Sequence, residues 1–148
     1  RLRMCCGHVG LILSRCGRDA MVLVDTSVWI DFFQSPNSTV AENLARLIVG
    51  HNQVVLCGIV LQEVLQGIRG ARNFDLVQER LLRFPFVDAD RETWLQAANL
   101  YRLLRTKVIT VPTTDATIAA LALQHNLLLF SRDRHFEIIA ASSKLRLY

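Results

Sequence analysis

Three aspartates stand close behind short apolar runs or at the start of a predicted helix. Asp25 directly follows MVLV (21–24), and Asp133 follows LLLF (127–130) across two residues. Asp115 opens a further predicted helix. Sites in open parallel sheets form outside the carboxyl ends of the strands. We therefore expect these three carboxylates, although far apart in the sequence, to converge at one edge of a sheet.

Such a group of carboxylates favours a divalent cation. Crowded carboxylates repel one another and raise each other's pKa, whereas a hard cation removes that penalty. Mg²⁺ prefers oxygen ligands and keeps several waters, so a few acidic side chains suffice. The ion can polarise a phosphoryl oxygen and supply hydroxide for attack on a phosphodiester. Taken singly, each aspartate also has a structural explanation, as a helix cap or a charge in a first helical turn.

Other candidate residues give weaker signals. A helical wheel turns Glu63 away from an apolar stripe at Leu61 and Leu65, which predicts a solvated carboxylate. The histidines at 51, 125 and 135 are isolated in the sequence, and we expect them at the surface or at helix ends. Cys57 ends an apolar strand, where an inert buried thiol is expected. No Gly-rich phosphate loop, G-x-S-x-G elbow or H-E-x-x-H motif occurs.

The elements that must position these residues alternate between strands and helices. We expect strands over 21–24, 53–57 and 127–130, with a short FV element at 86–87, whereas VITV (108–111) fits a strand or a loop. Helices are predicted after Asp25 as far as Pro36, and over 39–49, 61–68, 72–83, 90–104, 115–125 and 134–140. In the helix after Asp90, the apolar stripe expected to pack inward consists of Trp94, Ala97, Ala98, Tyr101 and Leu104. Thr113 and Thr114 are expected to cap the next helix. Strands separated by helices imply one α/β domain, a parallel sheet with helices on both faces.

Composition limits the alternatives further. The 148 residues are 51% hydrophobic and 20% charged, which excludes a disordered tail or a fibrous repeat. No apolar run reaches the roughly 18 to 20 residues of a membrane-spanning helix. Most of the net charge of +4 lies in residues 1–20, so basicity of the whole domain is weak support for a nucleic-acid partner. A single cysteine in residues 21–148 favours a reducing, cytoplasmic setting.

Residues 1–20 do not match the pattern of the rest. A zinc site built from Cys5, Cys6, His8 and Cys16 is conceivable, but adjacent cysteines lack the paired spacing of structural zinc sites. We expect residues 1–20 to be an upstream or expression-derived extension, with Met21 as the natural start and residues 21–148 as the domain.

Four segments resemble the PIN-domain family, and more narrowly the VapC-type toxins of bacterial toxin–antitoxin pairs. They are MVLVDTSVWIDFF, LCGIVLQEVLQGIRG, TTDATIAALALQHN and LLLFSRDRHFEII, in the family's order and spacing. The resemblance covers residues 21–148, essentially the whole predicted domain. It implies a single PIN-like domain and a Mg²⁺- or Mn²⁺-dependent endoribonuclease. Such an enzyme is usually a homodimer and is held inactive by a cognate VapB-type antitoxin.

The resemblance also assigns roles to individual residues. Asp25 and Asp115 would be the principal metal ligands, directly or through water. Glu63 and Asp133 would complete the acidic cluster and help to position metal or attacking water, and Ser27 would be a supporting hydroxyl. The candidate RNA-binding arginines are Arg69, Arg72, Arg132 and Arg134, although the last two could instead form salt bridges. Structured RNA, such as tRNA or a ribosomal RNA loop, is the implied substrate class.

Two other functions stay open from the sequence. The first is a catalytically silent PIN-like domain that binds an antitoxin or RNA, and metal-dependent cleavage would separate it from a nuclease. The second is a Mg²⁺-dependent phosphatase with an aspartyl nucleophile. That chemistry usually places a second aspartate two residues after the first, where this chain has Ser27.

Overall fold

A five-stranded parallel sheet organises the protein. The computed structural model describes residues 20–50 and 54–148, so most of the predicted leading segment lies outside the described residues. The strands lie in the order β3-β2-β1-β4-β5. Their bounds are β1 Val22–Val24, β2 Val54–Cys57, β3 Phe86–Val87, β4 Leu128–Phe130 and β5 Arg146–Leu147. The predicted α/β class with a parallel sheet is confirmed.

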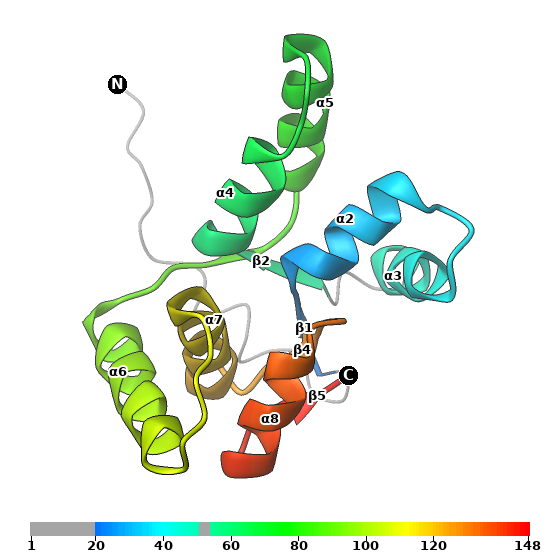
Figure 1. The fold of residues 1–148 in the computed structure, drawn as a ribbon. Coiled ribbons are helices and arrows are strands. Elements are labelled where there is room, and N and C mark those ends of the chain that lie inside the picture. The colour runs from blue at the N-terminus through cyan, green and yellow to red at the C-terminus, as the bar shows by residue number, and fades with distance from the viewer. Residues whose placement is uncertain (1–19, 51–53) are drawn as a thin grey trace.

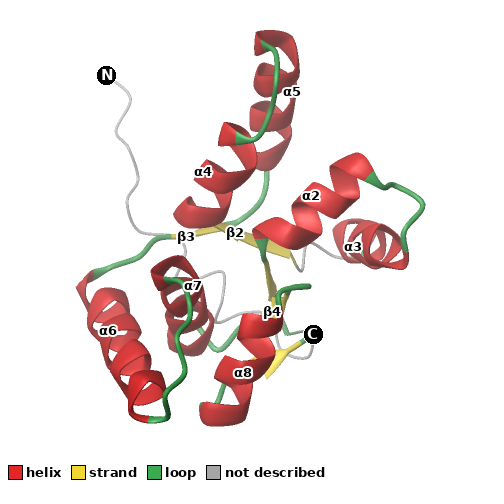
Figure 2. Ribbon diagram, in the orientation of Figure 1, coloured by secondary structure: helices red, strands yellow, loops and turns green. Residues whose placement is uncertain are grey.

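Helices connect the strands (Figures 1 and 2). They are α2 Thr26–Gln34, α3 Thr39–Val49, α4 Gly58–Gln66, α5 Ala71–Leu81, α6 Arg91–Thr106, α7 Thr113–Gln124 and α8 Arg134–Ser142. Parallel crossovers are right-handed, which places α2 to α5 on one face of the sheet and α6 to α8 on the other. The two groups of helices lie on opposite sides of the strands in Figure 1. None of the described helices is long and apolar enough to cross a membrane.

The chain changes its winding direction between β1 and β4, and this point sets the location of the site. From β1 the chain moves outward through β2 to β3, and it then returns to pair β4 with the other edge of β1. The register places Val22 beside both Val54 and Leu128. Ligands of open parallel sheets bind outside the strand ends at such a switch point. The residues directly after β1 and β4 are therefore the ones that face each other there.

The core explains why the strands are continuous apolar runs. Every residue of β1 and β2 is buried, as expected when a parallel sheet is covered on both faces. Helix α7 is buried on almost every side, from Asp115 to Ala122. Its small alanines let α6 and α8 pack closely against it, and both contact it. This packing holds Asp115 rigidly at the start of α7.

The structure corrects two local predictions and settles a third point that the sequence left open. The buried side of α6 is Thr93, Ala97, Leu100 and Leu104, so the predicted stripe is shifted and Trp94 is 54% exposed. Helix α7 starts earlier than expected: its N-cap is Pro112, and Thr113 and Thr114 lie in its first turn. Residues 108–111 are a loop, which settles the choice between strand and loop.

Two helices end with a left-handed residue. After α6, Val108 has φ 61°, with its N–H bonded to the Arg105 carbonyl and the Ile109 N–H bonded to the Leu104 carbonyl. After α7, Asn126 has φ 54°, and the Leu127 N–H bonds to the Ala122 carbonyl. Glycine or asparagine suits this position. The predicted stop at Asn126 is confirmed, whereas a β-branched valine at 108 is strained.

Candidate metal centre

Asp25 stands at the carboxyl end of β1 and is buried. Its N–H donates to the Phe130 carbonyl at 2.9 Å, which fixes it against the end of β4. Its Oδ2 accepts three hydrogen bonds, from Ser27 N at 3.2 Å, Ser27 Oγ at 2.6 Å and Ser131 Oγ at 2.8 Å. Asp25 thus caps α2, the role that the structural explanation gave it. Among the described residues its Oδ1 makes no hydrogen bond, so this oxygen can face a cation.

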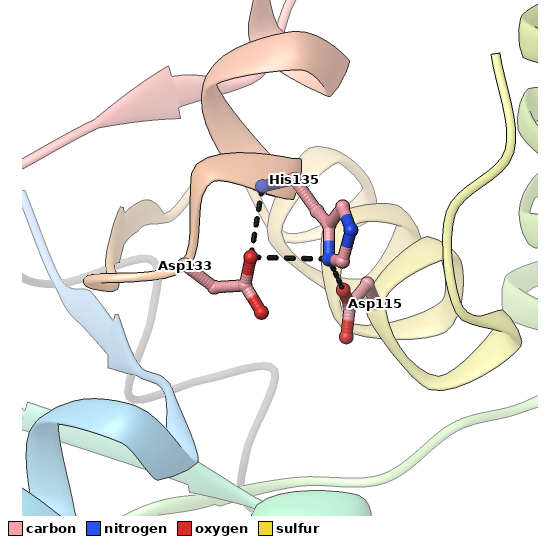
Figure 3. A group of neighbouring side chains, drawn as sticks. All are labelled: Asp115, Asp133 and His135. Carbon is pink, nitrogen blue, oxygen red and sulfur yellow. Dashed lines mark hydrogen bonds and ion pairs between the residues drawn. The ribbon is translucent and has the colours of Figure 1, made fainter.

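A second group of side chains, Asp115, Asp133 and His135, converges at the starts of α7 and α8 (Figure 3). Nδ1 of His135 lies 3.0 Å from Asp115 Oδ2 and 3.0 Å from Asp133 Oδ1. Asp115 is the buried member, with a side chain 12% exposed, whereas the Asp133 and His135 side chains are 41% and 38% exposed. One oxygen or nitrogen from each residue lies within 4.8 Å of the others. The group is compact enough to hold one metal ion and is open to solvent on one side.

Among residues 20–50 and 54–148, no lysine or arginine forms a salt bridge with Asp25, Asp115 or Asp133. The pKa of Asp115 is raised to about 6, first by burial and then by the negative charges of Asp133 and Asp25, against a smaller lowering by His135. Arg132, which directly precedes Asp133, donates instead to Asp31 at 2.7 Å. A divalent cation would relieve this repulsion. The oxygen-rich set of donors therefore fits a hard ion such as Mg²⁺.

Glu63 is held at the same end of the sheet by a different contact. Thr26 Oγ1 donates to its Oε2 at 2.6 Å, so the residue after Asp25 reaches across to α4. The buried residues of α4 are Val60 and Val64, whereas Leu61 and Leu65 are only partly buried. The expectation that Glu63 is a solvated carboxylate is wrong. Helix α4 turns Val60 and Val64 to the core in place of the predicted Leu61 and Leu65. Glu63 does not belong to the compact group around His135.

Serine side chains join Asp25 to the Asp133 loop. Ser131 Oγ donates to Asp25 Oδ2 and accepts the Asp133 N–H at 2.9 Å. Ser27 Oγ accepts the Arg132 N–H at 3.0 Å. The loop that carries Asp133 is therefore positioned by the same carboxylate that ends β1. Ser27 Oγ lies at hydrogen-bond distance from Asp25, and its role as a supporting hydroxyl stays a prediction.

Sequence reasoning missed three of these residues. Ser131 follows LLLF, and Thr26 follows Asp25, so both stand at strand ends where functional side chains gather. His135 comes two residues after Asp133, and this Asp-x-His spacing at a helix start was the available signal. Its proximity to Asp115 could not be read from the sequence, because 19 residues separate them.

The four candidate RNA-binding arginines are exposed. Arg132 forms the salt bridge with Asp31 that sequence analysis left as an alternative, although its partner is not Asp133. Arg134 lies at the first position of α8, next to Asp133. Arg69 lies between α4 and α5, and Arg72 lies in the first turn of α5. Cys57 is buried and burial raises the pKa of its thiol to about 11, so it is the inert thiol that was predicted.

Known proteins are similar to this chain in sequence and in fold. The chain is 29% identical over 129 residues to ribonuclease VapC11 of Mycobacterium tuberculosis, with 85% of this chain and 96% of that protein covered. VapBC2 from Rickettsia felis, solved bound to a DNA fragment from its promoter, superimposes with a TM-score of 0.72 at 18% identity, over 86% of this chain and 97% of that one. VapC20 of Mycobacterium tuberculosis, a sarcin-ricin loop cleaving toxin, gives a TM-score of 0.62 at 20% identity, over 84% of this chain and 98% of that one.

A family match covers almost the whole described fold, from residue 22 in β1 to residue 142 at the end of α8. It includes each of the strand ends and helix starts that carry Asp25, Glu63, Asp115 and Asp133. The resemblance seen in the four sequence segments is confirmed: the chain belongs to the PIN domain family.

Proposed function

We propose that this protein is a metal-dependent endoribonuclease toxin of the VapC type, which hydrolyses RNA phosphodiester bonds and is neutralised by a cognate VapB-type antitoxin. The observation that carries the proposal is the convergence of Asp25, Asp115 and Asp133 at the switch point of a PIN fold. The curated relatives that match nearly the full fold are ribonucleases.

The proposed cofactor is Mg²⁺, with Mn²⁺ as the alternative. Asp25 and Asp115 are the principal ligands in this proposal, directly or through water, and Glu63 and Asp133 complete the acidic cluster. When bound, the ion supplies Lewis-acid activation of the phosphoryl group and of water. The chain itself contributes orientation: the two serines fix Asp25, and Thr26 fixes Glu63.

The RNA backbone would meet positive charge on both sides of this centre. Arg134 is exposed beside Asp133, Arg69 is exposed between α4 and α5, and Arg72 is exposed in the first turn of α5. Lysine and arginine contacts to phosphates supply most of the affinity for a nucleic acid, without reading its sequence. Arg132 can add to this set when its contact with Asp31 is exchanged for a phosphate. We propose structured RNA, such as tRNA or a ribosomal RNA loop, as the substrate class.

The proposed protein partners are an antitoxin and a second copy of the chain. An antitoxin could place a basic side chain among the carboxylates and mimic the charge of the cation. For the homodimer, α6 exposes Trp94, which lines a hollow of about 580 Å³ together with mainly apolar atoms of α4, α6 and α7. A symmetric dimer can bury such a face against itself. We place these encounters in the cytoplasm, where RNA is available.

Cleavage of a total-RNA pool tests the nuclease. The full-length protein, freed of antitoxin, is incubated with Mg²⁺ or with EDTA, and Asp115→Asn is compared with Asp75→Asn, an exposed aspartate of α5. We expect discrete fragments from the wild type and Asp75→Asn with Mg²⁺, and none with EDTA or from Asp115→Asn. Cleavage that survives in Asp115→Asn would contradict the assignment of the site. No cleavage by folded, metal-bound protein would favour the silent binding module.

We also propose that residues 21–148 are sufficient for the domain and its activity. The sheet begins at Val22, directly after Met21, and the family match begins at the same residue. Deletion of residues 1–20 should leave the melting temperature and the cleavage pattern unchanged. A large loss of either would show that the leading segment contributes to the fold or to the site.

A further inference from the structure

We propose that His135 is a nitrogen ligand of the metal ion, alongside Asp115 and Asp133, and that its imidazole raises the affinity of the site for Mn²⁺ relative to Mg²⁺. This inference rests on the proposed metal-dependent function. The resemblance to the family implied only oxygen donors, from aspartate and glutamate side chains.

The first argument is the spacing of the donor atoms. Neighbouring ligands of an octahedral ion, each roughly 2.1 Å from the metal, lie about 3 Å from each other. Nδ1 of His135 lies 3.0 Å from Asp115 Oδ2 and 3.0 Å from Asp133 Oδ1. The nitrogen therefore stands at the distance from both carboxylates that one shared ion requires.

The second argument is the number of hydrogens that Nδ1 of His135 can carry. A neutral imidazole carries one N–H, and Nδ1 can direct it at one of the two oxygens but not well at both. The second carboxylate oxygen then faces the nitrogen without a hydrogen between them. A cation between the three atoms gives every donor a favourable partner, with the imidazole N–H moved to Nε2.

The third argument is that the ring is held in place from the backbone. The His135 N–H donates to Asp133 Oδ1 at 2.9 Å, and this contact caps α8. Phe136 and Ile139 on the same helix are buried in the core. The ring cannot leave the carboxylates without a side-chain rotation, and its exposed side leaves room for water and a phosphate.

The expected consequence is a changed choice of metal. Mg²⁺ is held almost entirely by oxygen ligands and water, whereas Mn²⁺, the first member of the divalent transition series, also accepts a nitrogen ligand. The addition of one imidazole to the carboxylates of the site should therefore raise the affinity for Mn²⁺ more than the affinity for Mg²⁺. Removal of the imidazole should weaken Mn²⁺ binding roughly tenfold or more and Mg²⁺ binding less.

Electron paramagnetic resonance on Mn²⁺-loaded protein tests the proposal without measuring cleavage. Electron spin-echo modulation detects a directly bound imidazole through its ¹⁴N coupling. The samples are wild type, His135→Asn, which keeps an amide near the place of Nδ1, and Glu137→Gln, an exposed neighbour on α8. Binding constants for Mn²⁺ and Mg²⁺ are measured on the same samples, and circular dichroism shows that each is folded.

We expect ¹⁴N coupling in the wild type and in Glu137→Gln, and its loss in His135→Asn together with a smaller ratio of Mn²⁺ to Mg²⁺ affinity. Bound Mn²⁺ without ¹⁴N coupling in the wild type would overturn the assignment of His135 and leave the metal centre intact. Coupling that persists in His135→Asn would also overturn it. Failure of the wild type to bind either ion would refute the proposed metal centre as well as this inference.

Discussion

The buried carboxylate of Asp115 should make the metal-free protein less stable at neutral pH than at acid pH. Its pKa is raised from 3.8 to about 6, first by burial and then by the charges of Asp133 and Asp25. The folded state therefore holds the proton of Asp115 more tightly than the unfolded chain does. The stability that this proton contributes is fully present below about pH 4 and is lost as the pH rises through about 6.

The size of the effect follows from the same difference. A pKa of about 6 against 3.8 corresponds to about 3 kcal/mol at full strength. The neighbouring Asp133 and His135 side chains are well exposed to water, which screens part of this repulsion, so we expect about 1–2 kcal/mol. Asp115→Asn removes the charge at nearly constant volume. It should raise the free energy of unfolding by this amount at pH 7.5, and by much less at pH 4.

Thermal unfolding in EDTA at pH 4 and pH 7.5 measures this difference. For a domain of this size, about 1–2 kcal/mol corresponds to roughly 3–8 °C in melting temperature. Asp75→Asn, on the exposed surface of α5, is the matched control and should change neither value. If Asp115→Asn were less stable than the wild type at pH 7.5 without metal, the repulsion argument would be refuted. The contact with His135 would then outweigh the burial of the charge.

Three further substitutions test other parts of the structure. Val108→Gly should raise the free energy of unfolding by about 1 kcal/mol, because the backbone of Val108 is in the left-handed region and the residue is 92% exposed. Asn126→Gly is the control. A destabilised Val108→Gly would show that no strain is stored in the backbone at this position. Thr26→Val should reduce RNA cleavage roughly tenfold with little change in melting temperature, because Glu63 loses its hydrogen-bond donor. Thr39→Val is the control. If Thr26→Val cleaved RNA as well as this control, Thr26 would not belong to the site. Trp94→Lys should convert the dimer to a monomer, as measured by light scattering, whereas Leu82→Lys on the opposite group of helices should leave the dimer intact. A dimer that persists in Trp94→Lys would place the interface elsewhere.

The strands and the acids at their ends could be predicted from sequence because local signals determine them. MVLV and LLLF are continuous apolar runs, as strands covered on both faces must be. Asp25 and Asp133 follow these runs, and each also caps the next helix with its own carboxylate. The stop at Asn126 is local in the same way, because asparagine tolerates a left-handed backbone. These features depend on neighbours within a few residues.

The rotation of a helix about its axis was not predictable, because it depends on what packs against the helix. On α4 and α6 two overlapping apolar stripes compete, and the sequence does not say which one faces the core. On α4 the core takes Val60 and Val64, which brings Glu63 to Thr26. On α6 it takes Leu100, which leaves Trp94 exposed.

Contacts between distant segments were decided by the tertiary structure alone. The return of the chain from β3 to pair β4 with β1 brings α7 and α8 together, and with them Asp115 and His135. The same return sets Arg132 against Asp31, across 101 positions of the chain. The sequence by itself determined which residue types stand at the ends of the strands and therefore what kind of chemistry the site can do. Only the folded sheet, through its order of strands, decided which of those side chains meet.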